Sequence, residues 1–339
     1  MKLIKNTWKV KIGIFLNMNN ICAIILIFLC VVSGNKVSEF CHGSGEIMRC
    51  ECVGNEELEL SSSLNLDKLT KLLITSCTSV HLYSISLGNS NAIRDLIIHN
   101  VSDSLTFEPI VLSKKMGKFE LSRIGRIPLI DHDTFISISS IESFTIEDSK
   151  IGKFDEQFTN INVDLFILKN VAINHSVGIN FSNEGKILKI VNSTIRNMDG
   201  NINFAFFGSI EIINSTFDFR SPGDMTIEGF SVSIVDSVFT NVRINLIARG
   251  NALIKNNCAD GKSSLRVTSI YVNSNGNKLP TEIIYTQKGT KAISFQNKNN
   301  IVCIAGNCKC PKSITHNSYD KLHVNVYLGV VLLLILYGL

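Results

Sequence analysis

The 339-residue chain lacks the short signatures that most often mark an enzyme. It contains no Walker-type phosphate-binding glycine loop, no G-x-S-x-G nucleophile elbow and no H-E-x-x-H helix. Its 7 histidines are scattered without metal-ligand spacing. These absences argue against nucleotide hydrolysis, α/β-hydrolase chemistry and zinc proteolysis. The sequence therefore predicts a non-catalytic protein without a cofactor.

A large excess of charge is also missing. The formal net charge is +4, and the first 34 residues supply four lysines, Lys2, Lys5, Lys9 and Lys11, with no acidic residue. The remainder has 29 basic and 29 acidic residues, so no nucleic-acid partner is expected.

The apolar run ICAIILIFLCVV at 21–32 follows the lysines. We expect a secretory signal peptide over 1–34, with Met18 as another possible start and a retained transmembrane anchor as the alternative.

A repeat of 22 residues is the strongest positive signal. LKIVNSTI (188–195), IEIINSTF (210–217) and VSIVDSVF (232–239) stand 22 residues apart, and FILKNVAI (166–173) and FTIEDSKI (144–151) continue the series upstream. Looser copies extend the array from about Leu66 to Ile270. Such a period indicates stacked copies of one supersecondary unit.

The residues within each copy have the chemistry of a β-strand. Apolar β-branched or aromatic residues alternate with polar ones, as in Ile212 and Phe217. The links NINFAFFGS (201–209) and MTIEGF (225–230) show the same pattern around the turn-prone SPGD (221–224). We expect the apolar side chains of the first link to fill the core, namely those of Phe204, Phe206 and Phe207.

An Asn or Asp follows the strand in seven copies. These residues are Asn100, Asp148, Asn170, Asn192, Asn214, Asp236 and Asn256. Because Asn and Asp tolerate a left-handed backbone, the pattern predicts a tight corner at this position. Stacked side chains there can hydrogen-bond along the axis, and the sequence leaves open whether this ladder points inward or outward.

Two kinds of repeat protein share features with these copies. The motif LxxLxIxxC over 69–77 and the stretch IDHDTFISIS over 130–139 resemble an extracellular leucine-rich repeat. Downstream, Ser193, Ser215 and Ser237 occupy the slot where that family has Asn, and these coils look more like a parallel β-helix. The chain thus resembles extracellular β-solenoid repeat proteins. This resemblance implies an all-β, right-handed parallel β-solenoid of about 22-residue coils, with a leucine-rich-repeat solenoid as the alternative.

The cysteines gather at the two ends of the array. Of the 10, Cys22 and Cys30 lie in the expected signal peptide. The others form two groups of four: Cys41, Cys50, Cys52 and Cys77, then Cys258, Cys303, Cys308 and Cys310. Even numbers in an exported chain imply two disulfides per end, with the pairing left open. We expect a Cys-rich cap and first coil over 35–80, repeats over 81–257 and a second cap over 258–312.

The C-terminal segment 313–339 has the order of a lipid-anchor signal. The small residue Ser313 precedes a polar spacer and the apolar run VNVYLGVVLLLILYGL at 324–339. This order predicts a glycosylphosphatidylinositol anchor on Ser313, or else on Asn317, with a transmembrane tail helix as the alternative.

Export also allows N-glycosylation. Sequons of the form N-x-S/T occur at Asn100, Asn174, Asn180, Asn192 and Asn214.

Charged clusters are sparse and fit surface positions. Asp131, His132 and Asp133 read as a solvated turn, and Glu120, Arg123 and Arg126 read as strand and corner positions.

The expected function is recognition or adhesion at the extracellular face of the plasma membrane, through binding of an extracellular protein or glycan to the solenoid side wall. The alternatives are a carbohydrate-active lyase or hydrolase, and a structural coat or matrix component.

Overall fold

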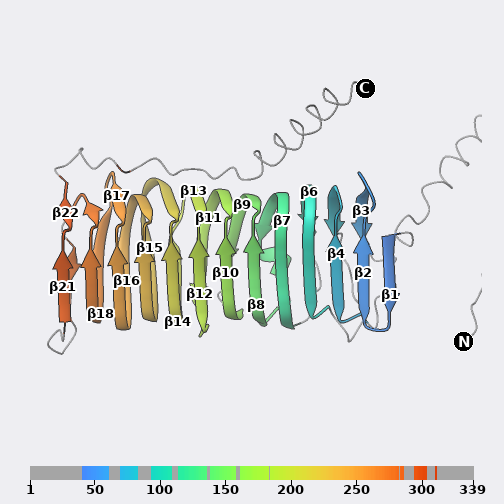
Figure 1. Ribbon diagram of the computed structural model, residues 1–339, viewed down its shortest axis with the longest axis horizontal. Helices are drawn as coiled ribbons and strands as arrows, with labels where there is room; N and C mark the ends of the chain where they lie inside the picture. Colours follow the sequence, from blue (N-terminus) through green and yellow to red (C-terminus); the bar gives the residue numbers. More distant parts are fainter. Residues whose placement is uncertain are drawn as a thin grey trace, which may run out of the picture.

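The computed structural model is an elongated stack of β-coils (Figure 1). Each turn of the stack has about 22 residues, so the predicted all-β parallel β-solenoid is confirmed. The structure describes residues 40–60, 69–82, 93–108, 114–135, 138–157, 161–182, 184–281, 283–285, 294–303 and 310. The expected signal peptide and anchor signal, with Ser313 and Asn317, lie outside these ranges.

Wall A is a set of parallel strands that runs the length of the stack (Figure 1). Its whole strands are β2 (Ile47–Glu51), β4 (Lys71–Thr75), β8 (Ser140–Glu147), β10 (Asn162–Lys169), β12 (Ile187–Val191) and β21 (Ser294–Lys298). It also takes the first parts of β6 (Asp95–Phe107) and β7 (Lys115–Asp131), and the last parts of β14 (Ile202–Ile213), β15 (Thr216–Val235), β16 (Val238–Lys255) and β18 (Ser264–Asn275).

Wall B follows wall A in each coil. It contains β3 (Glu57–Leu60), β5 (Ser79–Leu82), β9 (Lys150–Gln157), β13 (Thr194–Met198), β17 (Cys258–Asp260), β19 (Lys278–Leu279) and β22 (Ile301–Val302). The second parts of β6 and β7 and the first parts of β11 (Ala172–Ser182), β15 and β16 complete it.

Wall C closes the later coils. It comprises the second part of β11, the first parts of β14 and β18, the middle of β15 and β16, and β20 (Ile284–Tyr285). In the coil of β7, the 3-10 helix η1 (His132–Phe135) follows wall B. The strand β1 (Cys41–Ser44) pairs antiparallel with β2 at the N-terminal end of the stack.

Inward side chains stack from coil to coil as one apolar column. Ile212 and Phe217 are 0% exposed, as the alternating pattern predicts. The rings of Phe119, Phe144 and Phe166 stack in succession with centroid distances of 5.0 Å at both steps. Because one coil is too thin to enclose a core, each coil is buried by its two neighbours.

A left-handed corner joins wall A to wall B. All seven Asn and Asp residues predicted there have φ between 47° and 56°. Their ladder points outward: Asn192 and Asn214 are exposed, and Asn214 Nδ2 donates to Asn192 Oδ1 at 2.9 Å. Asn170 Nδ2 donates to Asp148 Oδ1 at 2.7 Å in the same way.

A second ladder lies one residue later, inside the corner. Ser193, Ser215 and Ser237 are at most 2% exposed. The backbone N–H of Ser193 donates to Ser215 Oγ, and that of Ser215 donates to Ser237 Oγ, both at 3.2 Å. Asn257 continues the series by accepting from Ser237 N at 2.9 Å. Each buried corner N–H is thus satisfied by the next coil.

Two local expectations are wrong. The stretch 221–224 lies within the continuous strand β15, where the register with β16 shifts between Asp218 and Gly223. Phe206 does not fill the core, because it is 47% exposed whereas Phe204 and Phe207 are 1% and 3% exposed. A register shift between Phe204 and Phe207 breaks the alternation, and such a bulge turns side chains to the other face.

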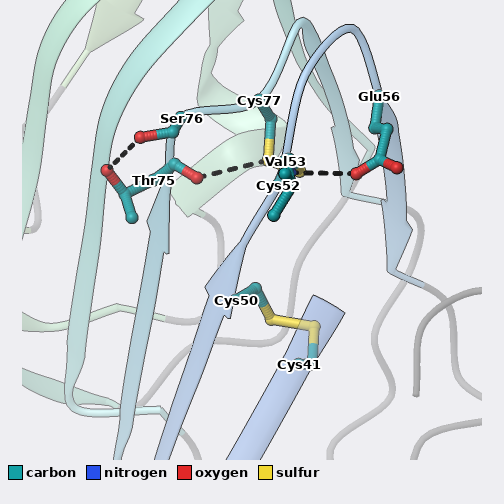
Figure 2. The surroundings of a disulfide bond; sticks show 8 residues. All are labelled: Cys41, Cys50, Cys52, Val53, Glu56, Thr75, Ser76 and Cys77. Atoms are coloured by element: carbon teal, nitrogen blue, oxygen red, sulfur yellow. Dashed lines mark hydrogen bonds between the residues drawn. A yellow bond between two sulfur atoms is a disulfide. The ribbon is translucent and has the colours of Figure 1, made fainter. Parts of the chain in front are cut away.

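Disulfides tie the end coils. Cys41–Cys50 joins β1 to β2, and Cys52–Cys77 joins the corners of the first two coils (Figure 2). Cys258 is bonded to Cys310, and Cys303 is also disulfide-bonded. Cys308 lies outside the described residues. Strands of the solenoid continue through both Cys-containing segments, so these segments contribute coils of their own.

Replacing Ser215 with Ala removes the acceptor of the Ser193 N–H and should lower the free energy of unfolding by about 1–3 kcal/mol. Ser215→Asn is the matched control, because Asn257 and Asn277 hold this position in later coils and accept through Oδ1. We expect the Asn variant to lose less stability. Urea unfolding followed by circular dichroism measures both, and an Ala variant as stable as the wild type would contradict a supporting role for the ladder.

Candidate binding surface

The outer face of wall A is a regular surface that spans the whole stack. Its strands stay in register from β2 to β21, so outward side chains form three columns along the axis. The columns begin at Ile47, Arg49 and Glu51. Outward side chains do not fill the interior, so this face is free to carry a binding function.

Apolar side chains remain exposed on this face. Ile187, Leu253 and Tyr271 are 40%, 36% and 44% exposed. Ion pairs lie between the apolar positions: Lys189 Nζ is 2.8 Å from Glu211 Oε2. The exposed apolar groups, Tyr271 among them, make this face a candidate for contact with a partner.

The aromatic ridge, defined as Phe206, Phe230 and Ile270, borders wall A at its corner with wall C. These residues are 47%, 64% and 40% exposed and lie where bulges interrupt the strand register. The guanidinium carbon of Arg249 lies 5.8 Å from the Phe206 ring centroid, and Arg249 Nη2 lies 2.9 Å from Glu228 Oε1. Aromatic and Arg side chains are enriched at binding hot spots.

The backbone of Phe206 adds to this evidence. Its φ is 67°, in the left-handed region that is sterically unfavourable for a bulky side chain. Phe206 therefore carries two unfavourable contributions to the free energy of folding: the strain of its backbone and the exposure of an apolar ring to water. Strained residues of this kind cluster at functional sites, so Phe206 makes the ridge a candidate binding element.

The charged residues Glu120, Arg123 and Arg126, predicted at the surface, have side chains that reach solvent. Arg123 and Arg126 are exposed, and Glu120 pairs with Lys118 at 3.5 Å. Asp131 accepts from Thr134 N and Thr134 Oγ1 at 3.2 and 3.1 Å, which places it at the start of η1.

The side chains of His132 and Asp133 lie outside the described part of the structure. In the described ranges, no group of three or more His, Cys, Asp or Glu residues is arranged to hold a metal ion. The same ranges contain no helix with the length and apolar character to cross a membrane.

None of the five sequons lies on the outer face of wall A. Asn174 lies on wall B and Asn180 on wall C, whereas Asn100, Asn192 and Asn214 lie on the corner between walls A and B. Asn174, Asn192 and Asn214 are exposed, and the other two are half-buried. Glycans at these positions remain a prediction, and they would leave the aromatic ridge uncovered.

Charge is segregated along the axis, a feature that the total net charge conceals. Residues 35–241 contain 17 Lys and Arg against 26 Asp and Glu, a net charge of −9. Residues 242–312 contain 11 Lys and Arg against 2 Asp and Glu, a net charge of +9. Exposed charged residues include Glu51, Glu57 and Glu59 together with Arg49 at the N-terminal end, and Lys255, Lys262, Arg266 and Lys298 at the C-terminal end. Summing charge by region, instead of over the chain, is the sequence signal that would have revealed this polarity.

The fold defines the class to which this chain belongs, the parallel β-solenoids. Its disulfides indicate an extracellular or secreted protein. No family model, no curated protein and no solved structure matches the sequence or the fold. The candidate binding surface must therefore be interpreted from its own side chains.

One acidic position on wall B carries a pH signature. Asp218, Thr240 and Asp260 occupy one column, and Asp260 Oδ1 is buried without a hydrogen-bond partner. Burial raises the pKa of Asp218, and Arg196 opposes this shift while Asp260 adds to it. The folded protein therefore holds a proton on Asp218 at a pH where the unfolded chain has released it.

Stability should fall as the pH rises through the folded-state pKa of Asp218, because the folded state binds the proton more tightly than the unfolded state. We expect Asp218→Asn to raise the melting temperature at pH 7 and to flatten the decline above about pH 4. Asp224→Asn is the control, since it removes an exposed carboxylate that pairs with Arg243. Thermal melts across this pH range measure the effect, and a lower melting temperature for Asp218→Asn at pH 7 would overturn the assignment.

Proposed function

We propose that this protein is a cell-surface recognition or adhesion ectodomain that binds its partner through the outer face of wall A and the aromatic ridge. The observation that carries this proposal is the exposed ring of Phe206, held in an unfavourable backbone beside Arg249. The fold has no use for that ring in its core, because Phe204 and Phe207 already fill the interior at this level.

The location of the protein supports the same function. Disulfides tie both ends of the stack, as in proteins of oxidising compartments. The expected signal peptide over 1–34 would export the chain, and an anchor on Ser313 would hold the C-terminal end of the rod near the membrane. The N-terminal end would then reach outward, which presents the long side wall to neighbouring cells or matrix.

The side wall also has the reach that recognition requires. Solenoids use extended surfaces, and their contacts draw on residues from several coils. Phe230, Leu253 and Tyr271 come from three successive coils and are 64%, 36% and 44% exposed. A partner that covers these three side chains would contact wall A and the ridge together.

The variant Phe230→Ser/Leu253→Ser/Tyr271→Ser should reduce adhesion several-fold without lowering the amount of protein at the cell surface, because these side chains lie outside the core. Cells that display the full chain are allowed to settle on monolayers that either display the chain or lack it. The cells that remain attached under shear are counted. Val53→Ser/Val177→Ser is the matched control: these residues are 78% and 44% exposed and lie off this surface. Wild-type adhesion by the triple variant would refute the assignment of the binding face.

A further inference from the structure

We propose that the last strands of wall A bind an acidic polysaccharide with one carboxylate on every second sugar ring. The binding surface is the C-terminal field, defined as the outward positions of wall A in β15, β16 and β18 together with Lys298 of β21 (Figure 1): Ser231, Ser233, Val235, Asn251, Leu253, Lys255, Tyr271, Asn273, Asn275 and Lys298. This inference rests on the proposed recognition function and names the chemical class of the partner.

Carboxylates occur on the outer face of wall A as far as β14 and not within the C-terminal field. The upstream outward positions include Glu51, Asp95, Glu120, Glu147 and Glu211. The positions that define the field include no Asp or Glu. An anionic polymer would therefore meet like charges on the upstream coils and none on the field.

The lysines of this face differ in the same way. Upstream, Lys118, Lys169 and Lys189 each pair with a carboxylate, at 3.5, 3.6 and 2.8 Å. In the field, Lys255 and Lys298 are exposed, and neither forms an ion pair within the described part of the chain. Their ammonium groups are therefore available to the anions of a ligand.

The spacing of these two lysines selects the kind of polymer. They stand in one column with Asn275 between them, so two strand spacings separate them by about 10 Å along the axis. An extended polysaccharide with a carboxylate on every second ring repeats its charge at a similar distance. A densely sulfated chain would place further anions between the lysines, opposite no cation. The net charge of +9 over residues 242–312 attracts an anionic polymer to these coils.

The neutral side chains of the field suit the rest of a sugar chain, which presents hydroxyl groups around the apolar C–H faces of its rings. Asn273 and Asn275 carry amides, which donate and accept hydrogen bonds as hydroxyls do. Leu253, the neighbour of Asn273 in the middle column, is exposed and offers an apolar contact. Tyr271 is exposed one column away, about 7 Å to the side, where substituents of the rings can reach it.

The same composition argues against a protein as the partner of this field. The centres of protein interfaces are depleted in Lys and Ser and enriched in Arg. The field holds Ser231, Ser233, Lys255 and Lys298, and its defining positions include no Arg. A protein would have to remove these polar groups from water, whereas a polysaccharide can leave them partly hydrated.

The test measures binding of fluorescently labelled hyaluronate, which has one carboxylate per disaccharide. Cells that display the full chain are stripped of their own hyaluronate, and bound label is compared with that of cells without the chain. Lys255→Gln/Lys298→Gln removes both ammonium groups of the field. Lys118→Gln/Lys169→Gln is the matched control, because it removes two lysines of the same face that pair with carboxylates. Antibody staining corrects each variant for its surface level.

We expect wild-type cells to bind hyaluronate and not neutral dextran of the same length. The field variant should bind about tenfold less hyaluronate, because two charge-assisted contacts are lost. The control variant should stay within about twofold of the wild type, since its lysines are already paired. Added salt should weaken binding by the wild type more than the residual binding by the field variant.

Three results would contradict this inference. Equal hyaluronate binding by the wild type and the field variant would show that these lysines do not hold the polymer. Equal loss in the two lysine variants, with chondroitin sulfate bound more tightly than hyaluronate, would show attraction to charge in general. Wild-type cells that bind no hyaluronate and still adhere to monolayers would indicate a protein partner and leave the proposed function standing. Cells that do neither would refute the proposed function itself.

Discussion

The left-handed corner after wall A is the constraint on which the rest of the structure depends. One residue per coil, such as Asn192 or Asn214, takes a positive φ and so ends each strand of wall A at the same level. Because the strands end together, the coils stack in register. That register aligns Ser215 with the backbone N–H of the coil before it, superposes the phenylalanine rings inside and lines up the columns of side chains outside.

Much of this fold could be predicted from the sequence because its signals are local and repeated. The 22-residue period, the corner residues and the burial of Ile212 and Phe217 follow from patterns within one or two coils. The exposure of Phe206 could not be predicted. A bulge of one residue changes which face a side chain takes, and the pattern of apolar and polar residues in the sequence does not show where such a bulge falls. Nor could the direction of the Asn ladder, because Asn192 and Ser193 are both polar and only the turn of the backbone decides which one is buried.

The candidate binding surface was harder to predict than the fold, for a physical reason. Core positions repeat because each coil must bury the next, whereas outward positions are free of that requirement and show no period. The ridge depends on three bulges, and the polarity of the rod depends on charges summed over many coils. Both arise from the stack as a whole, so the same register that buries the core also gives the outer face its length, its columns and its charged ends.

The dependence of each coil on its neighbours is tested most directly by native-state hydrogen exchange on the Ile212→Asp variant. A carboxylate in the apolar column is strongly unfavourable. We expect amide protection to be lost together in β12, β14 and β15, because these strands bury one another across successive coils. Loss of protection confined to β14 would show that single coils are stable on their own, and it would contradict the stacking that explains both the fold and its outer face.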